Sequence, residues 1–311
     1  MNPRSPLVAA IALLCVILLL VGTFMGVIGA FAAPAKAAAP TSTASVSSVA
    51  PAVAAAPRPY LVLGDSLSAG YQPDRGDDPR GGYAARVAEG MAQRGQALRI
   101  TNLACTGEST STMRDGARCS YRQGSQQAAA LAFLRANPDT ALVTVSLGAN
   151  DVLRCAGASA TADAADAVDT RCVQQRVRAL RPELARQLTE LRRAAPQARV
   201  VVLDYYDPSQ AGYLVDRRTR SVGNLASMVR TQVNMAVRGA ARDAGVRVAY
   251  VTEPFDDRWT RSVATDEYGI LPIRVARICA WTWMCHRTDI HPNDEGYRVI
   301  GDAVLTSLRR S

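Results

Sequence analysis

From residue 60 onward, short apolar runs alternate with longer segments of helical periodicity. The apolar runs are rich in Val, Leu and Ile and carry few charges, which is typical of strands buried on both faces of a sheet. They cover residues 60–63, 99–104, 141–146, 200–203 and 246–251. The helical segments cover residues 83–94, 126–136, 173–194, 225–244 and 295–308. This alternation predicts a three-layer α/β/α domain with a mostly parallel, five-stranded sheet.

The start of the chain has a different pattern. Residues 7–33 form an apolar run without a charged side chain, and Arg4 precedes it. A cleavable signal peptide usually has an apolar core of about 7–15 residues, whereas a membrane-spanning helix needs about 20. The length therefore favours an uncleaved anchor, although small residues at 30–32 and 35–37 leave cleavage open. We assign residues 1–33 to a signal peptide or signal-anchor helix that exports the rest of the chain.

Two further regions follow this apolar segment. Residues 34–58 are rich in Ala, Pro, Ser and Thr and lack apolar periodicity, which predicts a linker. Residues 59–311 then form one domain, which is long enough for a single large core. Gly22 and Gly26 have the spacing of a membrane-helix dimer interface. Chance explains that spacing more simply, and we expect a monomer.

Charge excludes one class of function. The net charge is +9, but the arginines are scattered among acids and form no basic stripe with interleaved aromatic residues. Nucleic-acid binding is therefore not expected. Mild basicity instead suits attraction to an anionic cell-envelope surface.

Cysteine usage agrees with export. Of seven cysteines, Cys15 lies inside the apolar run, where a buried thiol is expected. An even number in the exported part implies disulfides, and six cysteines allow 15 connectivities. We predict nearest-neighbour pairing because each such pair brackets an expected loop. The pairs are Cys105–Cys119, Cys155–Cys172 and Cys279–Cys285. No CxxC spacing indicates a metal site.

Candidate chemistry lies where the predicted strands end. Parallel sheets form their sites at the carboxyl ends of strands. Turns rich in Gly, Ser and Asx residues follow the first three strands, and a fourth precedes the last helix. These turns cover residues 64–68, 104–109, 148–151 and 289–293.

Together these turns contain the groups that acyl transfer requires: a nucleophile, a base and donors for an oxyanion. Ser66 can supply a hydroxyl that becomes nucleophilic once a base removes its proton. The chain has only two histidines, His286 and His291, so candidates for the base are few. The backbone N–H groups of Ser66 and Gly107 and the side-chain amide of Asn150 can form an oxyanion hole.

The four turns, in this order, resemble the SGNH (GDSL) hydrolase family. The matching residues are Gly-Asp-Ser-Leu at 64–67, Gly107, Gly-Ala-Asn-Asp at 148–151 and His-Pro at 291–292. The resemblance spans residues 60–311 and is greatest to secreted actinomycete lipases and esterases. It implies a flavodoxin-like sheet, ester hydrolysis through Ser66 and His291, and oxyanion donors at Ser66, Gly107 and Asn150. The GxSxG turn of α/β-hydrolases is not found around Ser66.

One position departs from the family pattern. The family usually has Asp three residues before the histidine, but here that position is Thr288, and Asp289 is two residues before His291. The group that orients the imidazole fixes its tautomer and stabilises the imidazolium. Three candidates remain: Asp289 through a shifted backbone, the carbonyl of Thr288, or a distant acid.

We therefore predict an exported serine ester hydrolase that acts on small-molecule or lipid esters and needs no metal or organic cofactor. Two alternatives stay open: a carbohydrate O-deacetylase or acyltransferase of the same fold, or an inactive module that binds envelope glycans or lipids. Pocket shape decides among substrates. We expect loops to form this pocket, at 71–80, 152–172, 205–222 and 253–285.

The remaining polar and aromatic residues have simpler interpretations. Asp65 and Asp151 are expected to be structural, and His286 to be a loop residue beside Cys285. Trp281 and Trp283 are candidates for lining the acyl pocket, although packing in the core is the simpler expectation.

Overall fold

The computed structural model describes residues 56–155, 169–215, 217–255 and 261–309. Five parallel strands form one sheet in the order β2-β1-β3-β4-β5. Its strands are β1 (Arg58–Gly64), β2 (Leu98–Asn102), β3 (Leu142–Ser146), β4 (Arg199–Leu203) and β5 (Arg247–Ala249). The predicted five-stranded α/β architecture is confirmed. The apolar segment at 1–33, with Cys15, Gly22 and Gly26, lies outside the described residues, as do residues 34–55 of the expected linker.

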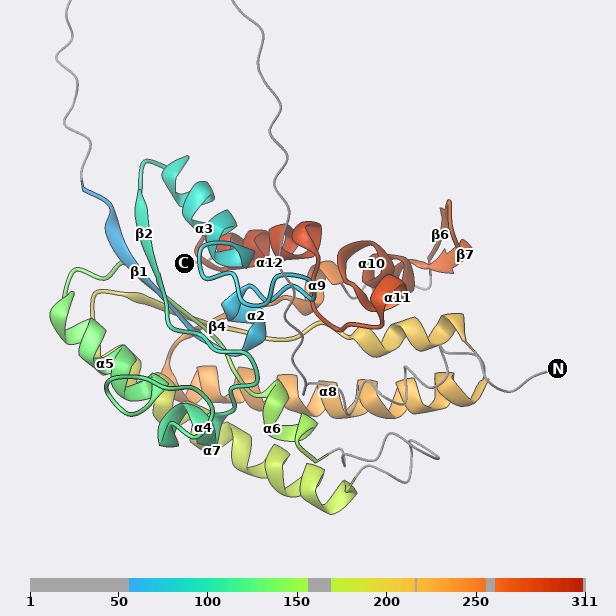
Figure 1. Cartoon of the computed structure of the whole chain (residues 1–311), viewed down its shortest axis with the longest axis horizontal. Coiled ribbons are helices and arrows are strands. Elements are labelled where there is room, and N and C mark those ends of the chain that lie inside the picture. Colours follow the sequence, from blue (N-terminus) through green and yellow to red (C-terminus); the bar gives the residue numbers. More distant parts are fainter. Residues whose placement is uncertain (1–55, 156–168, 216, 256–260, 310–311) are drawn as a thin grey trace, which may run out of the picture. The chain divides into compact units, whose positions relative to one another are not determined.

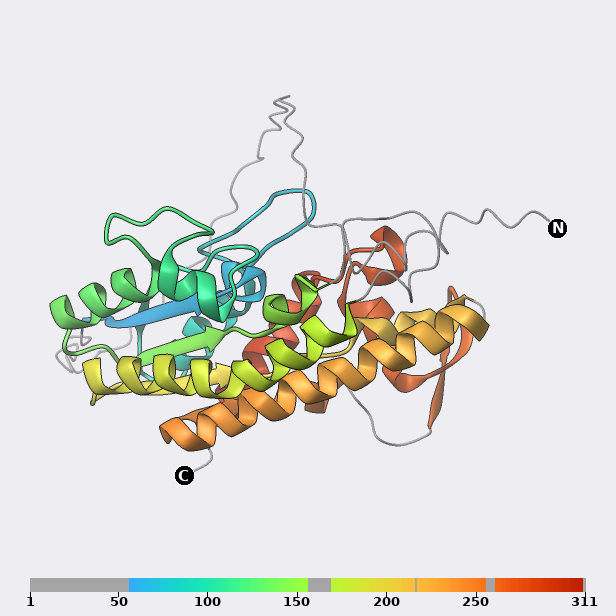
Figure 2. The same cartoon turned by 90° about the horizontal axis from the view of Figure 1, so that it is seen from below.

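Long helices cover both faces of the sheet. They are α3 (Gly82–Ala92), α5 (Gln126–Ala136), α7 (Thr170–Ala194), α8 (Arg217–Ala244) and α12 (Asp294–Ser307). Helices α3 and α12 pack against each other on one face, and α5, α7 and α8 lie on the other (Figure 1). Figure 2 shows α7 and α8 running side by side. These helices have one apolar side each, which the sheet and the neighbouring helix bury.

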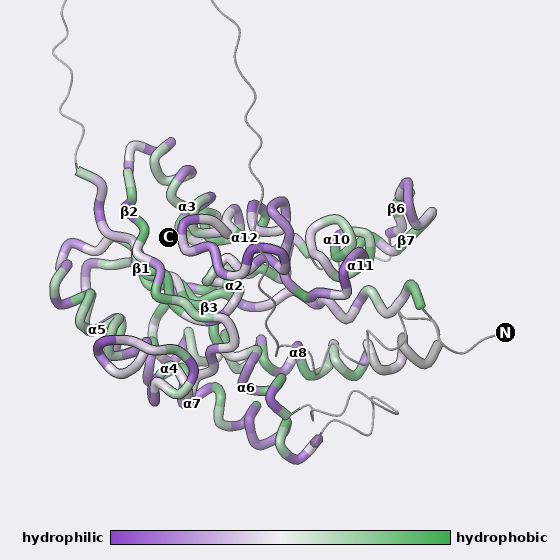
Figure 3. The backbone as a smooth tube through the Cα atoms, viewed as in Figure 1, coloured by the Kyte–Doolittle hydropathy of each residue, from purple (hydrophilic) through white to green (hydrophobic). Residues whose placement is uncertain are grey.

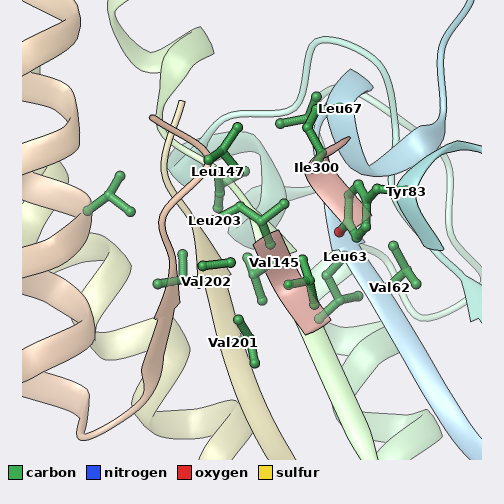
Figure 4. Packing of buried hydrophobic residues seen from close by; sticks show 14 of the residues in the cluster. Val62, Leu63, Leu67, Tyr83, Val145, Leu147, Val201, Val202, Leu203 and Ile300 are labelled. Carbon is green, nitrogen blue, oxygen red and sulfur yellow. The ribbon is translucent and has the colours of Figure 1, made fainter. Parts of the chain in front are cut away.

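Apolar side chains on both faces of the central strands form the core. Residues 60–63 of β1 are fully buried, and β3 and β4 are buried along nearly their whole length. Figure 3 shows this as a hydrophobic centre to the sheet, and Figure 4 shows Leu63, Val145 and Val202 packed side by side. Two polar side chains on these strands pair with each other in the core: the Tyr60 hydroxyl lies 3.0 Å from the Thr144 hydroxyl. Burial on both faces explains why these strands carry almost no charge.

Shorter elements occupy segments that we expected to be loops. They are α2 (Ser66–Ala69), α4 (Thr110–Asp115), α6 (Ala149–Leu153), the 3-10 helix η1 (Pro208–Leu214), α9 (Thr252–Phe255), β6 (Ser262–Thr265), β7 (Gly269–Pro272), α10 (Ile273–Trp281) and α11 (Met284–Arg287). Strands β6 and β7 form an antiparallel hairpin.

The prediction of loops at 205–222 and 253–285 was wrong, because helices and a hairpin occupy much of these two segments. Helix α8 begins at Arg217, eight residues before the expected start at 225. Its first turns are polar and have no apolar periodicity, so the pattern did not reveal them. They form a helix where α8 packs against η1, so tertiary contacts override the weak local signal.

Three disulfides join the cysteines in the predicted pairs, Cys105–Cys119, Cys155–Cys172 and Cys279–Cys285. The first closes the loop that contains α4. The second joins the end of α6 to the first turn of α7, and the third joins α10 to α11. Of the helices in the described ranges, none is both long and apolar enough to cross a bilayer.

Candidate active site

Three of the four predicted turns meet at one edge of the sheet. Gly64 at the end of β1 pairs with Ser146 at the end of β3, and Val62 pairs with Asn102 at the end of β2. The chain passes from β1 to β2 on one side and returns to β3 on the other, so strand order reverses here. Such a switch point is where parallel sheets bind ligands.

Ser66 is the first residue of α2, directly after β1. Asp65 caps this helix, and its carboxylate accepts hydrogen bonds from the Leu67 N–H (3.1 Å), the Ser146 hydroxyl (2.7 Å) and the Tyr205 hydroxyl (2.7 Å). Gly64 has φ +119°, and a Cβ there would lie 1.9 Å from the Ser146 carbonyl oxygen. Only glycine therefore allows β1 to turn so sharply into the serine.

Asp65 is a structural residue in this arrangement, as expected. Burial raises the pKa of its carboxyl to about 6, although the hydroxyl and N–H donors oppose that shift. Its oxygens face the helix start and two hydroxyls rather than the imidazole. The group therefore fixes the conformation of the serine turn.

His291 faces Ser66 across 225 positions of sequence. Its Nε2 lies 2.8 Å from Ser66 Oγ, and its Nδ1 lies 2.7 Å from Asp289 Oδ1. A carboxylate only accepts hydrogen bonds, so the ring proton is assigned to Nδ1, which leaves Nε2 free to accept the hydroxyl proton of Ser66. His291 is 4% exposed and Ser66 9% exposed. The three side chains form one continuous hydrogen-bonded chain.

Asp289 reaches the imidazole because the backbone changes direction at Thr288. Thr288 ends α11 with φ 56°, and it is the only non-glycine residue of the described ranges with positive φ. The Asp289 carboxylate then also accepts a hydrogen bond from the His291 N–H, at 2.8 Å. Of the candidates for the orienting group, it is the Asp289 side chain rather than the Thr288 carbonyl that contacts Nδ1.

The histidine in turn keeps Asp289 ionised. Burial alone would raise the pKa of the Asp289 carboxyl, but the hydrogen bonds and charge of His291 outweigh burial and hold the pKa below its ordinary value. An ionised carboxylate at Nδ1 stabilises a positive charge on the ring.

One aromatic ring packs against the imidazole, and two hydrogen bonds hold the backbone on which it stands. The centroid of the Tyr71 ring lies 4.4 Å from that of the His291 ring, and the backbone N–H of Trp283 donates to the His291 carbonyl at 3.0 Å. The Tyr206 hydroxyl donates to the carbonyl of Ile290, the preceding residue. These contacts limit movement of the ring away from Ser66.

The predicted oxyanion residues lie in the turns beside the serine. Gly107 has φ +84°. The side-chain amide of Asn150 donates to the carbonyl of Glu108, the residue that follows Gly107, at 2.9 Å. Asn150 is the second residue of α6 and is buried. Asp151 is structural, as expected, because its carboxylate accepts from the N–H and hydroxyl of Thr110.

Gln126 is a site residue that our sequence reasoning missed. Its Oε1 accepts from the Gly64 N–H at 2.6 Å, and its Nε2 donates to the Gly64 carbonyl at 3.1 Å. The same Nε2 lies 3.0 Å from Glu108 Oε2. One buried amide thus connects the serine turn to the turn that contains Gly107. No motif marks Gln126, which is an ordinary polar residue at the start of α5.

The two tryptophans that were candidates for lining the acyl pocket contact other groups. Trp281 packs edge-on against Phe255 and lines a cavity of about 310 Å³ whose lining includes neither Ser66 nor His291. Trp283 Nε1 donates to the Gln72 side chain at 2.6 Å.

His286 belongs to the short helix α11 rather than to a loop, and its Nδ1 lies 3.9 Å from Glu267. Within the described ranges, no group of three or more His, Cys, Asp and Glu side chains is placed to hold a metal ion.

A family sequence model and solved structures were compared with this chain. The sequence model of the GDSL-like Lipase/Acylhydrolase family matches residues 62–299. No curated protein sequence matches the chain. An extracellular lipase from Streptomyces rimosus has a similar structure, with a TM-score of 0.53 and 17% identity over 80% of this chain and 99% of the lipase. For phospholipase A1 from Streptomyces albidoflavus NA297 the TM-score is 0.49 and the sequence identity is 19%, over 81% of this chain and 100% of the phospholipase. At such identities, similarity to the lipase shows a shared fold.

Proposed function

This chain belongs to the GDSL-like lipase/acylhydrolase family, and from that premise we propose that it is an exported serine ester hydrolase that works through an acyl-enzyme on Ser66. The observation that carries the proposal is the continuous chain of hydrogen-bond contacts from Ser66 Oγ to His291 Nε2 and from His291 Nδ1 to Asp289. Small-molecule or lipid esters are the proposed substrates.

The first half-reaction forms the acyl-enzyme. His291 Nε2 takes the proton of Ser66 while Oγ bonds to the ester carbonyl carbon, and the carbonyl electron pair moves to oxygen. The Asp289 carboxylate stabilises the resulting imidazolium. The intermediate then breaks its bond to the alcohol oxygen, which receives the proton from Nε2. The alcohol leaves, and the acyl group stays on Ser66.

Hydrolysis repeats these steps with water. Nε2 takes a proton from water as the water oxygen bonds to the acyl carbon, and the proton then passes to Ser66 Oγ as the acid departs. In both steps the proposed donors to the oxyanion are the N–H groups of Ser66 and Gly107 and the Asn150 amide. Loss of one such donor typically lowers kcat by about 10²–10³.

A chromogenic short-chain ester tests the proposal directly. We expect Ser66→Ala to remove turnover, because the variant lacks the hydroxyl that bonds to the ester carbonyl and that His291 contacts. Ser120→Ala is the matched control, since Ser120 is exposed and lies outside the site. Full turnover by Ser66→Ala would reject the proposed nucleophile.

Labelling with an organophosphonate distinguishes a hydrolase from an inactive binding module of the same fold, because only an activated serine reacts. We expect the wild-type protein to gain the mass of one phosphonyl group and Ser66→Ala to gain none. An unlabelled wild-type protein would favour the binding module.

We also propose that residues 59–311 act outside the cytoplasm, with residues 1–33 as signal peptide or anchor. Three disulfides support this, because such bonds persist in oxidising compartments. N-terminal sequencing of protein from culture medium and from membranes identifies which form exists. Free thiols at these six cysteines in exported protein would contradict the proposal.

A further inference from the structure

Arg118 is held against the turn that contains Gly107. Its Nε donates to the Thr106 carbonyl at 3.0 Å, and the neighbouring Cys119 is bonded to Cys105. A Cβ on Gly107 would lie 2.7–2.9 Å from the Nε, Cζ and Nη2 atoms of the guanidinium. The guanidinium therefore occupies the space that a side chain at position 107 would need. It lies directly beside the proposed oxyanion donor.

The rest of this guanidinium faces solvent. Arg118 is exposed, and within the described residues only its Nε has a hydrogen-bond partner. Its terminal nitrogens, Nη1 and Nη2, keep their donors for a ligand. The Thr106 carbonyl holds the Nε of this side chain, and the neighbouring disulfide holds its backbone. Arg118 therefore loses less side-chain entropy on binding a ligand than an unrestrained arginine would.

Charges of both signs surround this turn, and burial raises the pKa of the nearby Glu108 carboxyl while the charge of Arg118 itself acts to lower it. Arg154, at the end of α6, donates to the Ser109 hydroxyl at 3.1 Å, so a second guanidinium lies at the same turn. Asp77 approaches from the Thr106 side, where it accepts hydrogen bonds from the Thr106 hydroxyl and N–H. The Glu108 carboxylate is buried and contacts Gln126. Within the described ranges, Arg118 forms no ion pair with Asp77 or Glu108.

We propose that Arg118 binds an anionic group of the substrate, a carboxylate or phosphate within a few bonds of the scissile carbonyl. The inference deepens the proposed function and rests on it, because position 107 adjoins the reacting carbonyl only if Gly107 serves the oxyanion. The planar fork of N–H donors on a guanidinium matches carboxylate and phosphate oxygens. The preferred substrates are then anionic esters.

Two matched substrate pairs test this on the exported protein. The acyl-side pair is 4-nitrophenyl butyrate and 4-nitrophenyl hemisuccinate, which differ in a terminal carboxylate. The alcohol-side pair is dihexanoylglycerol and its 3-phosphate, both below their micellar concentrations. The measured quantity is the ratio of kcat/KM for the anionic member to kcat/KM for the neutral member.

We expect Arg118→Gln to lower this ratio about tenfold for one pair, because the variant loses its charge-assisted hydrogen bond to the anionic group. The pair affected shows whether the anion lies on the acyl or the alcohol side. Arg118→Lys should retain part of the ratio, and the wild-type ratio should fall with added salt. Arg122→Gln removes an exposed charge from the same loop and is the matched control.

Two outcomes overturn the inference. If Arg118→Gln lowers both members of each pair equally, Arg118 shapes the oxyanion turn and does not read the substrate. If Arg118→Gln leaves kcat/KM of all four substrates unchanged, Arg118 has no role in recognition. Failure of the proposed function looks different: the wild-type protein would then hydrolyse no neutral ester and would resist phosphonate labelling.

Discussion

Asp289 determines the tautomer of the proposed base. We expect Asp289→Ala and Asp289→Asn to lower kcat at least about tenfold, because Nδ1 loses its anionic acceptor and the imidazolium its counter-charge. Steady-state kinetics with the chromogenic ester measure this. Thr288→Ala is the control, since it keeps the backbone carbonyl at 288. Unchanged kcat in both Asp289 variants would favour the Thr288 carbonyl as the group that orients the imidazole.

The raised pKa of Asp65 predicts that the stability of the folded protein depends on pH. Its folded pKa of about 6 lies above the ordinary 3.8, so between these values the folded protein binds more protons than the unfolded chain. Stability therefore falls as the pH rises through this window, and the full cost, on the order of 3 kcal/mol, is present above it. Asp65→Asn carries no such cost, although it disturbs the hydrogen bonds equally at every pH.

Urea unfolding from pH 4 to 7 isolates the titration of Asp65. Relative to Asp65→Asn, the wild-type free energy of unfolding should fall as the pH rises. Asp139→Asn, at an exposed carboxyl, is the control for loss of one negative charge. A difference between wild type and Asp65→Asn that stays constant with pH would contradict the raised pKa.

The motif residues of the site were predictable because each lies in a turn directly after a strand or before a helix. The partner of His291 stayed open among three candidates, of which Asp289 was one, because the choice depends on the positive φ of Thr288, which residue types do not reveal. Gln126 and Arg118 were missed for a related reason. Both act on backbone groups of other turns, and neither belongs to a local pattern.

Close packing of two helices predicts the effect of adding one methyl group. A Cβ at Gly301 of α12 would lie 2.6 Å from the Arg86 Cβ and 3.1 Å from the Tyr83 carbonyl oxygen of α3. These atoms cannot move without the helix. Alanine normally stabilises a helix relative to glycine, but here we expect Gly301→Ala to destabilise the protein by about 1–3 kcal/mol.

Chemical denaturation checks this prediction, with Thr306→Ala on the exposed side of α12 as the control. The substitution at Gly301 should also reduce activity, because α12 supports the site: the Tyr297 hydroxyl donates to the Tyr71 carbonyl at 2.9 Å. A Gly301→Ala variant as stable as the wild type would show that the helices can separate at little cost.

The long elements could be predicted and the short ones could not, because periodicity needs several residues to be visible. Strands buried on both faces are continuous apolar runs, and α7 has one apolar side over many turns. Helix α2 has four residues, fewer than two turns. The β6–β7 hairpin is largely exposed, so burial imposes little pattern on it.

The disulfides act on the whole molecule, through its unfolded state. Cys155–Cys172 spans 17 positions and joins the end of α6, the helix that contains Asn150, to the first turn of α7. Closing such a loop removes unfolded-state entropy equivalent to about 3 kcal/mol. We therefore expect Cys155→Ala/Cys172→Ala to lower the free energy of unfolding by about that amount, measured by urea denaturation without reductant.

Cys279–Cys285 provides the comparison, because it spans only 6 positions and precedes Thr288, Asp289 and His291. A shorter loop restricts the unfolded chain less, so Cys279→Ala/Cys285→Ala should cost less stability. It should lower kcat instead, because α10 and α11 position the turn that carries the base. If removing the longer cross-link left the free energy of unfolding unchanged while dithiothreitol destabilised the wild type, the stabilisation would have to come from the other two disulfides.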